Sequence, residues 1–362
     1  MKAAVCHEFG KPLVVEELEI DPPQQGEVRV RMAAVAICHS DIHLVKGDWG
    51  GETPVVAGHE ASGVVEEVGE GVSLVQPGDH VVVSLLRSCG RCFYCTTGAP
   101  YSCDSEYGLD REGRLRTPQG RPVHHGLRTA AFAEYAVVDQ SQLVTIPKEV
   151  PLDRAALLAC GVITGLGAVV NTAQVEPGSS VVVIGTGGVG LNAVQGAKLA
   201  GAYPIIAVDL LDNKLAAARH FGATHAVNAS REANLPAAIK ELTSGRGADY
   251  AVVTVGSAPA VTGGFYTIRP GGMVVMVGIP ERSTTLTLSA ADFVFDGPRQ
   301  IVGSNMGSTR LSIDVPRLVG LYQRGGLLLD ELITTRYPLE EINEAIEAVE
   351  KGEALRNVIV FG

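Results

Sequence analysis

The sequence predicts an α/β protein with two domains, an irregular β-barrel and a doubly wound parallel sheet. Three observations support this prediction. Short apolar runs separated by turn residues fill the first 150 residues, strands alternate with helical segments from about Gly178 onward, and 362 residues are enough for two domains of ordinary size. Short strands with frequent turns are typical of barrels, and strand–helix alternation is typical of a doubly wound sheet.

The apolar patterns place the elements in order. In the first part we expect strands at 28–36, 62–68, 80–84 and 132–138, with turns such as Gln76-Pro77-Gly78-Asp79 between them. In the second part we expect strands at 180–184, 205–209, 250–256, 273–279 and 300–303, and helices at 191–199 and 213–221. The tail predicts an amphipathic helix at 339–349 and a closing strand at 357–361.

Composition and charge exclude several classes of protein. Hydrophobic residues make up 46% and charged residues 19%, which excludes an intrinsically disordered chain. The net charge is −11 and no basic run occurs, so we expect neither nucleic acid nor a membrane as partner. The N-terminus lacks a signal-peptide pattern, and we expect a cytoplasmic protein. The uncharged segment 155–175 contains glycines and polar residues, so it predicts a buried helix rather than a membrane span.

The cysteines indicate metal sites rather than disulfides. Seven cysteines, an odd number, occur in a chain without a signal pattern. Four have the spacing Cys89-x2-Cys92-x2-Cys95-x7-Cys103, which suits a structural zinc with four thiolates better than an iron–sulfur cluster. Cys38, His59 and Cys160 together would supply two thiolates and an imidazole, leaving a fourth position open for water or substrate.

A glycine-rich turn indicates a dinucleotide site. The segment Gly185-Thr186-Gly187-Gly188-Val189-Gly190 follows a predicted strand and opens a helix. Glycines there let backbone N–H groups approach a pyrophosphate at a helix N-terminus. Asp209 ends the next predicted strand, and a carboxylate at that place accepts from a ribose 2′-OH and repels a 2′-phosphate, which favours NAD over NADP.

Several motifs together resemble one family. GHEASGVVEEVGEGV, ICHSDIH, ACGVITG and the four-cysteine cluster are similar in order and spacing to the zinc-containing alcohol dehydrogenases of the medium-chain dehydrogenase/reductase superfamily. The resemblance implies a GroES-like catalytic domain at 1–161 with a structural zinc lobe at 87–105, an NAD-binding Rossmann domain at 162–304, and a return to the catalytic domain at 305–362. It also implies two zinc ions per chain and NAD-linked oxidation of an alcohol to an aldehyde, by hydride transfer from a zinc alkoxide.

The resemblance implies roles for individual residues of the catalytic domain. Ser40 and His43 match the positions that relay the alcohol proton to the surface, Asp41 matches the carboxylate that orients His59, and Glu60 matches a glutamate near the zinc. The pocket positions are mostly apolar, which favours a primary aliphatic, allylic or aromatic alcohol; they are Trp49, Leu85, Gly126, Leu127 and Ile279.

Coenzyme contacts are implied in the same way. Besides Gly185, Gly187, Gly188, Gly190 and Asp209, the matching positions are His39, Thr164, Val189, Lys214, Val277, Ile279 and Arg356. His39 stands where an arginine is frequent. Because histidine is only partly charged near neutral pH, we expect weaker and pH-sensitive coenzyme binding, which His39→Arg should tighten.

Two alternatives and the assembly state stay open at this point. Trp49 stands where the glutathione-dependent formaldehyde branch has an acidic residue, and the loss of that charge argues against a hydroxymethyl-glutathione substrate. VNTAQVEPGSSVVVIG and LNAVQGAKLAGA are similar to bacterial enzymes with tightly held nicotinamide or a thiol cosubstrate. A thiol-dependent formaldehyde dehydrogenase and a nicotinoprotein are therefore alternatives. The matching edge strand at 300–304 predicts a homodimer, with a tetramer as the other possibility.

Overall fold

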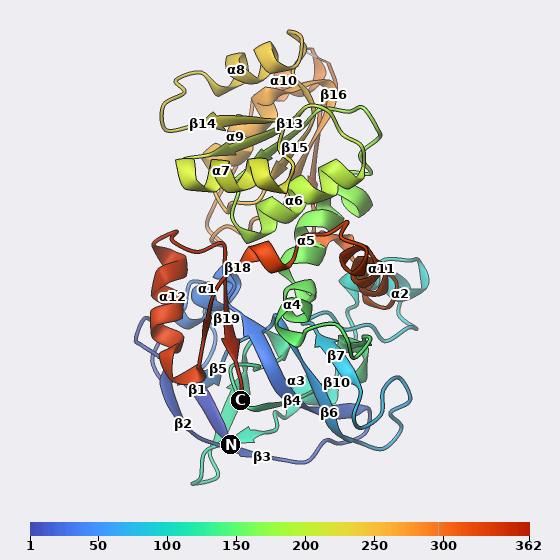
Figure 1. Cartoon of the computed structure of the whole chain (residues 1–362), viewed down its shortest axis with the longest axis vertical. Coiled ribbons are helices and arrows are strands. Elements are labelled where there is room, and N and C mark those ends of the chain that lie inside the picture. The colour runs from blue at the N-terminus through green and yellow to red at the C-terminus, as the bar shows by residue number, and fades with distance from the viewer. Residues whose placement is uncertain (296) are drawn as a thin grey trace. The chain divides into compact units, whose positions relative to one another are not determined.

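The computed structural model describes residues 1–295 and 297–362, and the chain divides into two compact units. The first unit comprises Met1–Gly161 and Arg310–Gly362, and the second comprises Val162–Thr309. Figure 1 shows the course of the chain through them. Mixed sheets together with a parallel helix-flanked sheet confirm the predicted α/β fold class.

Two sheets form the first unit. One has six strands in the order β2-β1-β5-β9-β8-β3, which span Val14–Glu17, Lys2–Cys6, Val55–Val56, Pro122–His125, Leu115–Arg116 and Glu19–Ile20. The other has seven strands in the order β11-β7-β6-β4-β19-β18, with β10 also paired to β4. These strands span Leu143–Thr145, His80–Val83, Ala61–Val68, Glu27–Ala36, Arg356–Val360, Ile333–Tyr337 and Tyr135–Asp139.

The long strand β4 shows why the sequence forms this sheet. Its side chains alternate, so that Val28, Val30 and Met32 are buried while Arg29 and Arg31 pair with glutamates of β6. Alternating apolar residues on one face remove a continuous apolar surface from water. The same unit contains the helices α1 (His39–Lys46), α2 (Phe93–Thr96), α3 (Gly108–Arg111), α4 (Leu152–Ala156), α11 (Leu311–Gln323) and α12 (Ile342–Glu350).

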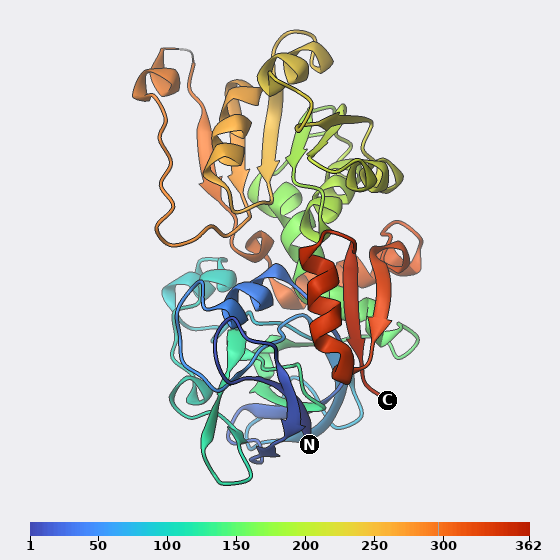
Figure 2. The ribbon, with the colours of Figure 1, turned by 90° about the vertical axis from the view of Figure 1, so that its left-hand side faces the viewer.

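The second unit is a parallel sheet of six strands in the order β14-β13-β12-β15-β16-β17. In chain order they span Val181–Ile184, Ile205–Asp209, His225–Asn228, Ala248–Val253, Ile268–Met276 and Gln300–Gly303. The helices are α5 (which begins at Gly161 and ends at Gly167), α6 (Gly188–Leu199), α7 (Asp212–Phe221), α8 (Leu235–Leu242), α9 (Ala258–Thr267) and α10 (Ala290–Val294). Figure 2 shows helices on both faces of this sheet.

Close approach of backbones explains two glycines, one in the segment before the sheet and one in α6. A Cβ on Gly165 would lie 2.1 Å from the Val189 carbonyl oxygen, and one on Gly196 would lie 3.0 Å from Leu166 Cα. Glycine lets the segment 161–172 pack directly on α6, where any larger residue would force the two apart.

The prediction of one buried helix over 155–175 is wrong. The segment comprises α4, a 3-10 turn (Leu157–Ala159), α5 and a π-helical turn (Ala168–Thr172). Cys160 breaks the first half, with φ −144° and ψ −71°, which is outside the helical region. Among the described residues no single helix is long and apolar enough to cross a membrane; only the bent pair Leu152–Ala159 and Gly161–Thr172 reaches that length together.

Candidate active site and coenzyme turn

A buried cluster of potential metal ligands lies in the first unit. One ligand atom from each of Cys38, His59, Glu60 and Cys160 lies within 4.8 Å of the others. Cys38 follows β4 and caps α1, His59 and Glu60 precede β6, and Cys160 occupies the break described above. The non-helical conformation of Cys160 separates it from the regular helical path, and its Sγ lies 3.2 Å from His59 Nε2.

The orientation of His59 is set by Asp41, which is itself buried. Asp41 Oδ1 lies 2.9 Å from His59 Nδ1 and also accepts from the Gly58 N–H at 2.9 Å. Its second oxygen accepts from the Cys38 N–H at 3.2 Å. With Nδ1 bonded to the carboxylate, Nε2 is the imidazole nitrogen that faces the thiols, as in carboxylate–histidine–zinc arrangements.

Burial and the contacts among these residues shift the pKa values of three members of the cluster. Burial opposes the charged form of His59, but the Asp41 carboxylate and Cys38 together raise its pKa well above the ordinary value. Hydrogen bonding with Cys160 lowers the pKa of Cys38, and the same contact, with burial, raises the pKa of Cys160. Zinc binds deprotonated ligands, and two thiolates with one imidazole are a donor set that it favours.

Glu60 and Arg356 form a buried ion pair beside this cluster. Glu60 Oε2 contacts Arg356 Nη2, and Glu60 Oε1 accepts from the Gly161 N–H at 3.1 Å. Burial raises the pKa of Glu60 to about 7, although the guanidinium acts in the opposite direction. Sequence reasoning assigned these two residues to separate tasks and missed their contact, because no local pattern links positions so far apart in the chain.

Helix α1 carries the three polar residues expected near substrate and coenzyme. His39 is exposed, and Ser40 and His43 are half-buried on its first two turns. His43 Nδ1 lies 2.6 Å from Asp48 Oδ2, and its ring lies 5.4 Å from the ring of Trp49. The Asp48 contact was not foreseen; the signal was a carboxylate five residues after the histidine, just past the end of the helix.

The predicted pocket residues of the first unit lie on different segments. Trp49 lies against His43, and Leu85 is half-buried after β7. A Cβ on Gly126 would lie 2.6 Å from the Val56 carbonyl oxygen and 2.7 Å from Leu44 Cδ2, so only glycine fits this backbone position. Leu127 follows with φ 49°, in the left-handed region. Ile279 belongs to the second unit, where it is 57% exposed.

A second cluster comprises the thiols of Cys89, Cys92, Cys95 and Cys103, whose Sγ atoms lie within 4.8 Å of one another. The Sγ of Cys89 accepts from Ser105 Oγ at 2.9 Å and from the Cys92 N–H at 3.3 Å. The Ser105 hydroxyl and backbone N–H groups lower the pKa of Cys89 to about 6. Four converging sulfurs with N–H donors suit a tetrahedral zinc without an open position.

The glycine turn lies at the carboxyl end of the central strand of the second unit. Gly185 follows β12 with φ +88°, and a Cβ on Gly190 would lie 1.9 Å from the Gly185 carbonyl oxygen. Thr254 Oγ1 donates to that same carbonyl at 2.7 Å. The turn is therefore held tight, and α6 begins directly after it, so its first turn presents a helix N-terminus of the kind that binds phosphate.

Asp209 ends the neighbouring strand β13 and contacts this turn. Its Oδ2 accepts from the N–H of Thr186 at 2.7 Å and from the Thr186 hydroxyl at 3.0 Å. The role of Thr186 was missed at the level of sequence, although a hydroxyl residue inside a glycine turn is itself a signal. The glycine cradle and the carboxylate fit the pyrophosphate and ribose of a dinucleotide.

Parallel registration gathers the other predicted coenzyme residues of this unit. Ile184 pairs with Val208 and Val253, and Val253 pairs with Met276, so these strands end at one edge of the sheet. Val277 and Ile279 follow β16 at that edge, and Val189 opens α6. Lys214 lies in the first turn of α7, and Thr164 is buried in α5. The order of strands reverses between β12 and β15, which is where doubly wound folds bind ligands.

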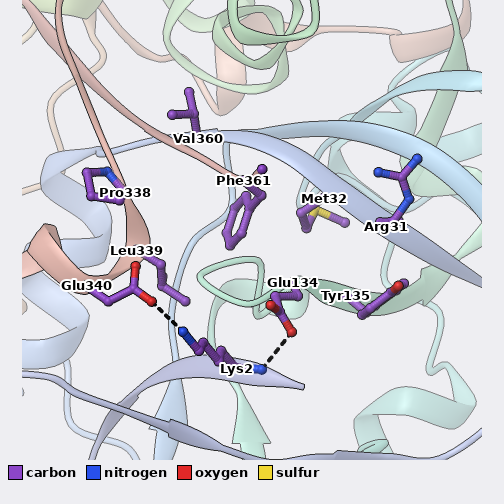
Figure 3. Close-up of a pocket in the computed structure, with 11 residues that line it drawn as sticks. Lys2, Arg31, Met32, Glu134, Tyr135, Pro338, Leu339, Glu340, Val360 and Phe361 are labelled. Carbon is purple, nitrogen blue, oxygen red and sulfur yellow. Dashed lines mark hydrogen bonds and ion pairs between the residues drawn. The ribbon is translucent and has the colours of Figure 1, made fainter.

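The first unit also has a cavity of about 280 Å³ next to both chain ends (Figure 3). Its wall includes Lys2, Glu134, Glu340 and Phe361. Lys2 Nζ forms an ion pair with Glu340 Oε1 at 2.7 Å, and the backbone N–H of Lys2 donates to Glu134 Oε2 at 2.8 Å. Its lining contains no ligand of either cysteine cluster.

Comparison with known proteins gives the class and then the family. Residues 24–148 match the model of the alcohol dehydrogenase GroES-like domain, and residues 188–324 match the model of the zinc-binding dehydrogenase. The fold and the cluster thus define a zinc-binding dehydrogenase. The chain is 41% identical over 369 residues to the NDMA-dependent alcohol dehydrogenase of Amycolatopsis methanolica, covering 99% of this chain and 98% of that protein.

Further relatives also match nearly the whole chain. Alcohol dehydrogenase 1 of Pisum sativum is 38% identical over 372 residues, with 99% and 96% covered. The crystal structure of benzyl alcohol dehydrogenase from Acinetobacter calcoaceticus aligns with a TM-score of 0.92 at 35% identity, covering 100% and 99%. The chain belongs to the zinc-containing alcohol dehydrogenases of the medium-chain dehydrogenase/reductase superfamily and is a zinc-binding oxidoreductase.

Proposed function

We propose that this protein is an NAD-dependent alcohol dehydrogenase that binds two zinc ions per chain and interconverts a primary aliphatic, allylic or aromatic alcohol and its aldehyde. The observation that carries the proposal is the buried cluster of Cys38, His59 and Cys160, with His59 held by Asp41. Zinc bound there supplies a Lewis acid that lowers the pKa of an alcohol. The four-cysteine cluster would hold the second, structural zinc.

The protein's own groups would handle the proton and the coenzyme. The Ser40 hydroxyl would accept the alcohol proton while its own proton moves on toward His43, which would release a proton to solvent. With Asp48 on Nδ1, Nε2 of His43 is left as the exchanging nitrogen. The proposed coenzyme residues are His39 and Arg356 in the first unit and Thr164, Gly185, Gly187, Gly188, Val189, Gly190, Asp209, Lys214, Val277 and Ile279 in the second. NAD bound there supplies the hydride acceptor. Glu60, paired with Arg356, would adjust charge beside the zinc.

Apolar walls favour a substrate without charge. Trp49, Leu85 and Leu127 offer no charged group that would bind an acidic thiol conjugate such as a glutathione adduct. The structural neighbour named benzyl alcohol dehydrogenase supports an aromatic alcohol as one candidate.

The second candidate is a nicotinoprotein that keeps its NAD during turnover. Its support is the 41% identity to a relative named for dependence on NDMA. Such an enzyme would reduce an external acceptor and would release no NADH. The third candidate is a thiol-dependent formaldehyde dehydrogenase, which would need a thiol such as glutathione as cosubstrate.

One experiment separates these functions. The zinc-loaded protein is incubated with ethanol, benzyl alcohol and an allylic alcohol, in separate samples with NAD and with NDMA. It is also incubated with formaldehyde and NAD, with and without glutathione. NADH formation from the alcohols is the expected result. Turnover only with NDMA, together with nicotinamide released on denaturation, would establish the second candidate. Turnover only with glutathione would establish the third, and metal analysis that finds fewer than two zinc ions per chain would remove one proposed site.

We further propose a homodimer, or a tetramer built from it, that joins sheets through β17. Gln300–Gly303 is the last strand of the sheet, and in the described part of the chain no strand pairs with its outer edge. Val294 and Phe295, just before it, are 72% and 87% exposed and would add apolar surface to such an interface. Sedimentation velocity should give a dimer or a tetramer, and a monomer at micromolar concentration would reject this assembly.

A further inference from the structure

The carboxylate of Asp209 is held by four donors from two segments. Thr186 donates its N–H and its hydroxyl to Oδ2, at 2.7 and 3.0 Å. The N–H groups of Leu210 and Leu211 donate to Oδ1, at 2.8 and 3.2 Å. Both oxygens of the carboxylate therefore accept hydrogen bonds from the protein. Of these donors, the Thr186 hydroxyl alone belongs to a side chain.

These hydrogen bonds restrict the rotation of the Asp209 carboxylate. The torsion at the end of an aspartate side chain is broad, so an untethered carboxylate turns with little cost. Thr186 is fully buried, and its two bonds converge on one oxygen. Hydrogen bonds to a charged acceptor are strong, so loss of the hydroxyl would leave Oδ2 with the Thr186 N–H as its one remaining donor and would loosen the carboxylate.

We propose that Thr186 is a positioning residue that determines coenzyme specificity, because its hydroxyl prevents the Asp209 carboxylate from turning away from a 2′-phosphate. The inference rests on the proposed function, in which Asp209 accepts from the ribose 2′-OH of NAD. Rejection of NADP depends on repulsion between two negative groups. A carboxylate that can rotate relieves this repulsion, and one that is held in place cannot.

A second threonine of the same unit provides a matched control. The Thr254 hydroxyl donates to the Gly185 carbonyl at 2.7 Å and to the Ile184 carbonyl at 3.3 Å, and neither bond involves the carboxylate. Removal of that hydroxyl loosens the cradle of the pyrophosphate, which NAD and NADP share. Thr254→Val should therefore weaken both coenzymes to the same degree.

The experiment measures direct binding of NADH and NADPH to the purified zinc-loaded protein by titration calorimetry. Thr186→Val has nearly the same volume without the hydroxyl, Thr186→Ala is a smaller second variant, and Thr186→Ser keeps the hydroxyl. We expect the ratio of NADH to NADPH affinity to fall about tenfold in Thr186→Val and Thr186→Ala. Thr186→Ser should keep the ratio near that of the wild type, and so should Thr254→Val.

The variant Asp209→Gly separates the proposed role of Thr186 from the proposed role of Asp209 in coenzyme binding. If Asp209→Gly abolishes the preference for NADH while Thr186→Val and Thr186→Ala keep the wild-type ratio, the role of Thr186 is overturned and that of Asp209 stands. If Asp209→Gly leaves the ratio unchanged, the coenzyme role of Asp209 fails and the inference fails with it. A fall in ratio for Thr254→Val equal to that for Thr186→Val would also overturn the inference, since general loosening of the turn would then explain both.

Discussion

Asp41 Oδ1 lies 2.9 Å from His59 Nδ1, and both side chains are buried. The same carboxylate also accepts from the backbone N–H groups of Gly58 and Cys38. One aspartate on the first turn of α1 thus fixes the ring of one ligand and the backbone of another. Loss of its charge would disturb two of the three proposed zinc ligands.

Asp41→Asn should therefore weaken zinc binding at the buried cluster about 10- to 100-fold, because the amide keeps the shape but loses the charge that orients the imidazole. Competition with a chelator, followed by metal analysis, measures this. Asp139→Asn is the matched control, since Asp139 also accepts a backbone N–H, from Ser141, and is not among the cluster residues. Equal zinc affinity in the wild type and Asp41→Asn would contradict the prediction.

Ser40→Ala should lower kcat for alcohol oxidation at neutral pH by about 100-fold, because the proton would lose its first acceptor. The loss should shrink at high pH, where hydroxide takes the proton directly. Steady-state kinetics over pH 6–10 with a saturating alcohol tests this. Near-wild-type kcat at neutral pH would remove Ser40 from the relay.

Asp48→Asn should lower kcat about tenfold, with little change in the KM of the alcohol. The present contact at 2.6 Å keeps the proton of His43 on Nδ1, whereas an amide can also donate there and shift the proton to Nε2. Glu52→Gln is the control, because Glu52 forms a comparable pair with the exposed His124 at 3.1 Å. If both variants have the same kcat, Asp48 has no part in the relay.

The pair of Glu60 and Arg356 predicts strong coupling in a double-mutant cycle. Arg356→Gln leaves a buried carboxylate without its partner and should destabilise the fold by about 3–5 kcal/mol. Combining it with Glu60→Gln should recover most of that loss, because no charge is then left buried. Denaturant unfolding of the four proteins measures the coupling, and simple additivity of the two single changes would refute it.

His125 predicts a pH dependence of stability. Burial, with the nearby charges of Arg87 and Arg114, lowers its pKa to about 4, and its Nε2 accepts from the Arg114 N–H at 3.0 Å. An unfolded histidine has a pKa of about 6.5. Between these two values the unfolded chain binds a proton that the folded chain does not bind, so stability falls as pH falls through this window.

His125→Gln keeps an acceptor for the Arg114 N–H but cannot titrate. Its free energy of unfolding should decline less than that of the wild type between pH 7 and pH 4, by on the order of 3 kcal/mol. Urea unfolding at several pH values gives this difference, in which losses common to both proteins cancel. His7→Gln, at an exposed histidine, is the control. Parallel profiles for the wild type and His125→Gln would show that the folded histidine is protonated as readily as the unfolded one.

Local patterns predicted much of the fold. The strands expected at 205–209 and 300–303 coincide with β13 and β17, because compact apolar runs bounded by polar residues have few other conformations. Elements rich in glycine were placed less well. Helix α6 begins at Gly188 rather than 191, and β16 begins at Ile268 rather than 273, since Pro270, Gly271 and Gly272 resemble a turn. In both cases contacts with neighbouring elements stabilise the helix or strand although the local sequence has a weak propensity to form it.

The sequence by itself determined the fold class and the family and predicted the kinds of ligand, because cysteine spacing, a glycine turn and strand–helix alternation are local chemical requirements. The tertiary structure alone decided which charges meet. Glu60 faces Arg356 across 296 positions of the chain, and Thr186 reaches Asp209 from a different strand end. The break in the helical path at Cys160 was likewise visible only in the tertiary structure. These contacts form between residues far apart in the sequence, and burial makes each of them strong. They produce no repeating pattern along the chain from which they could be predicted.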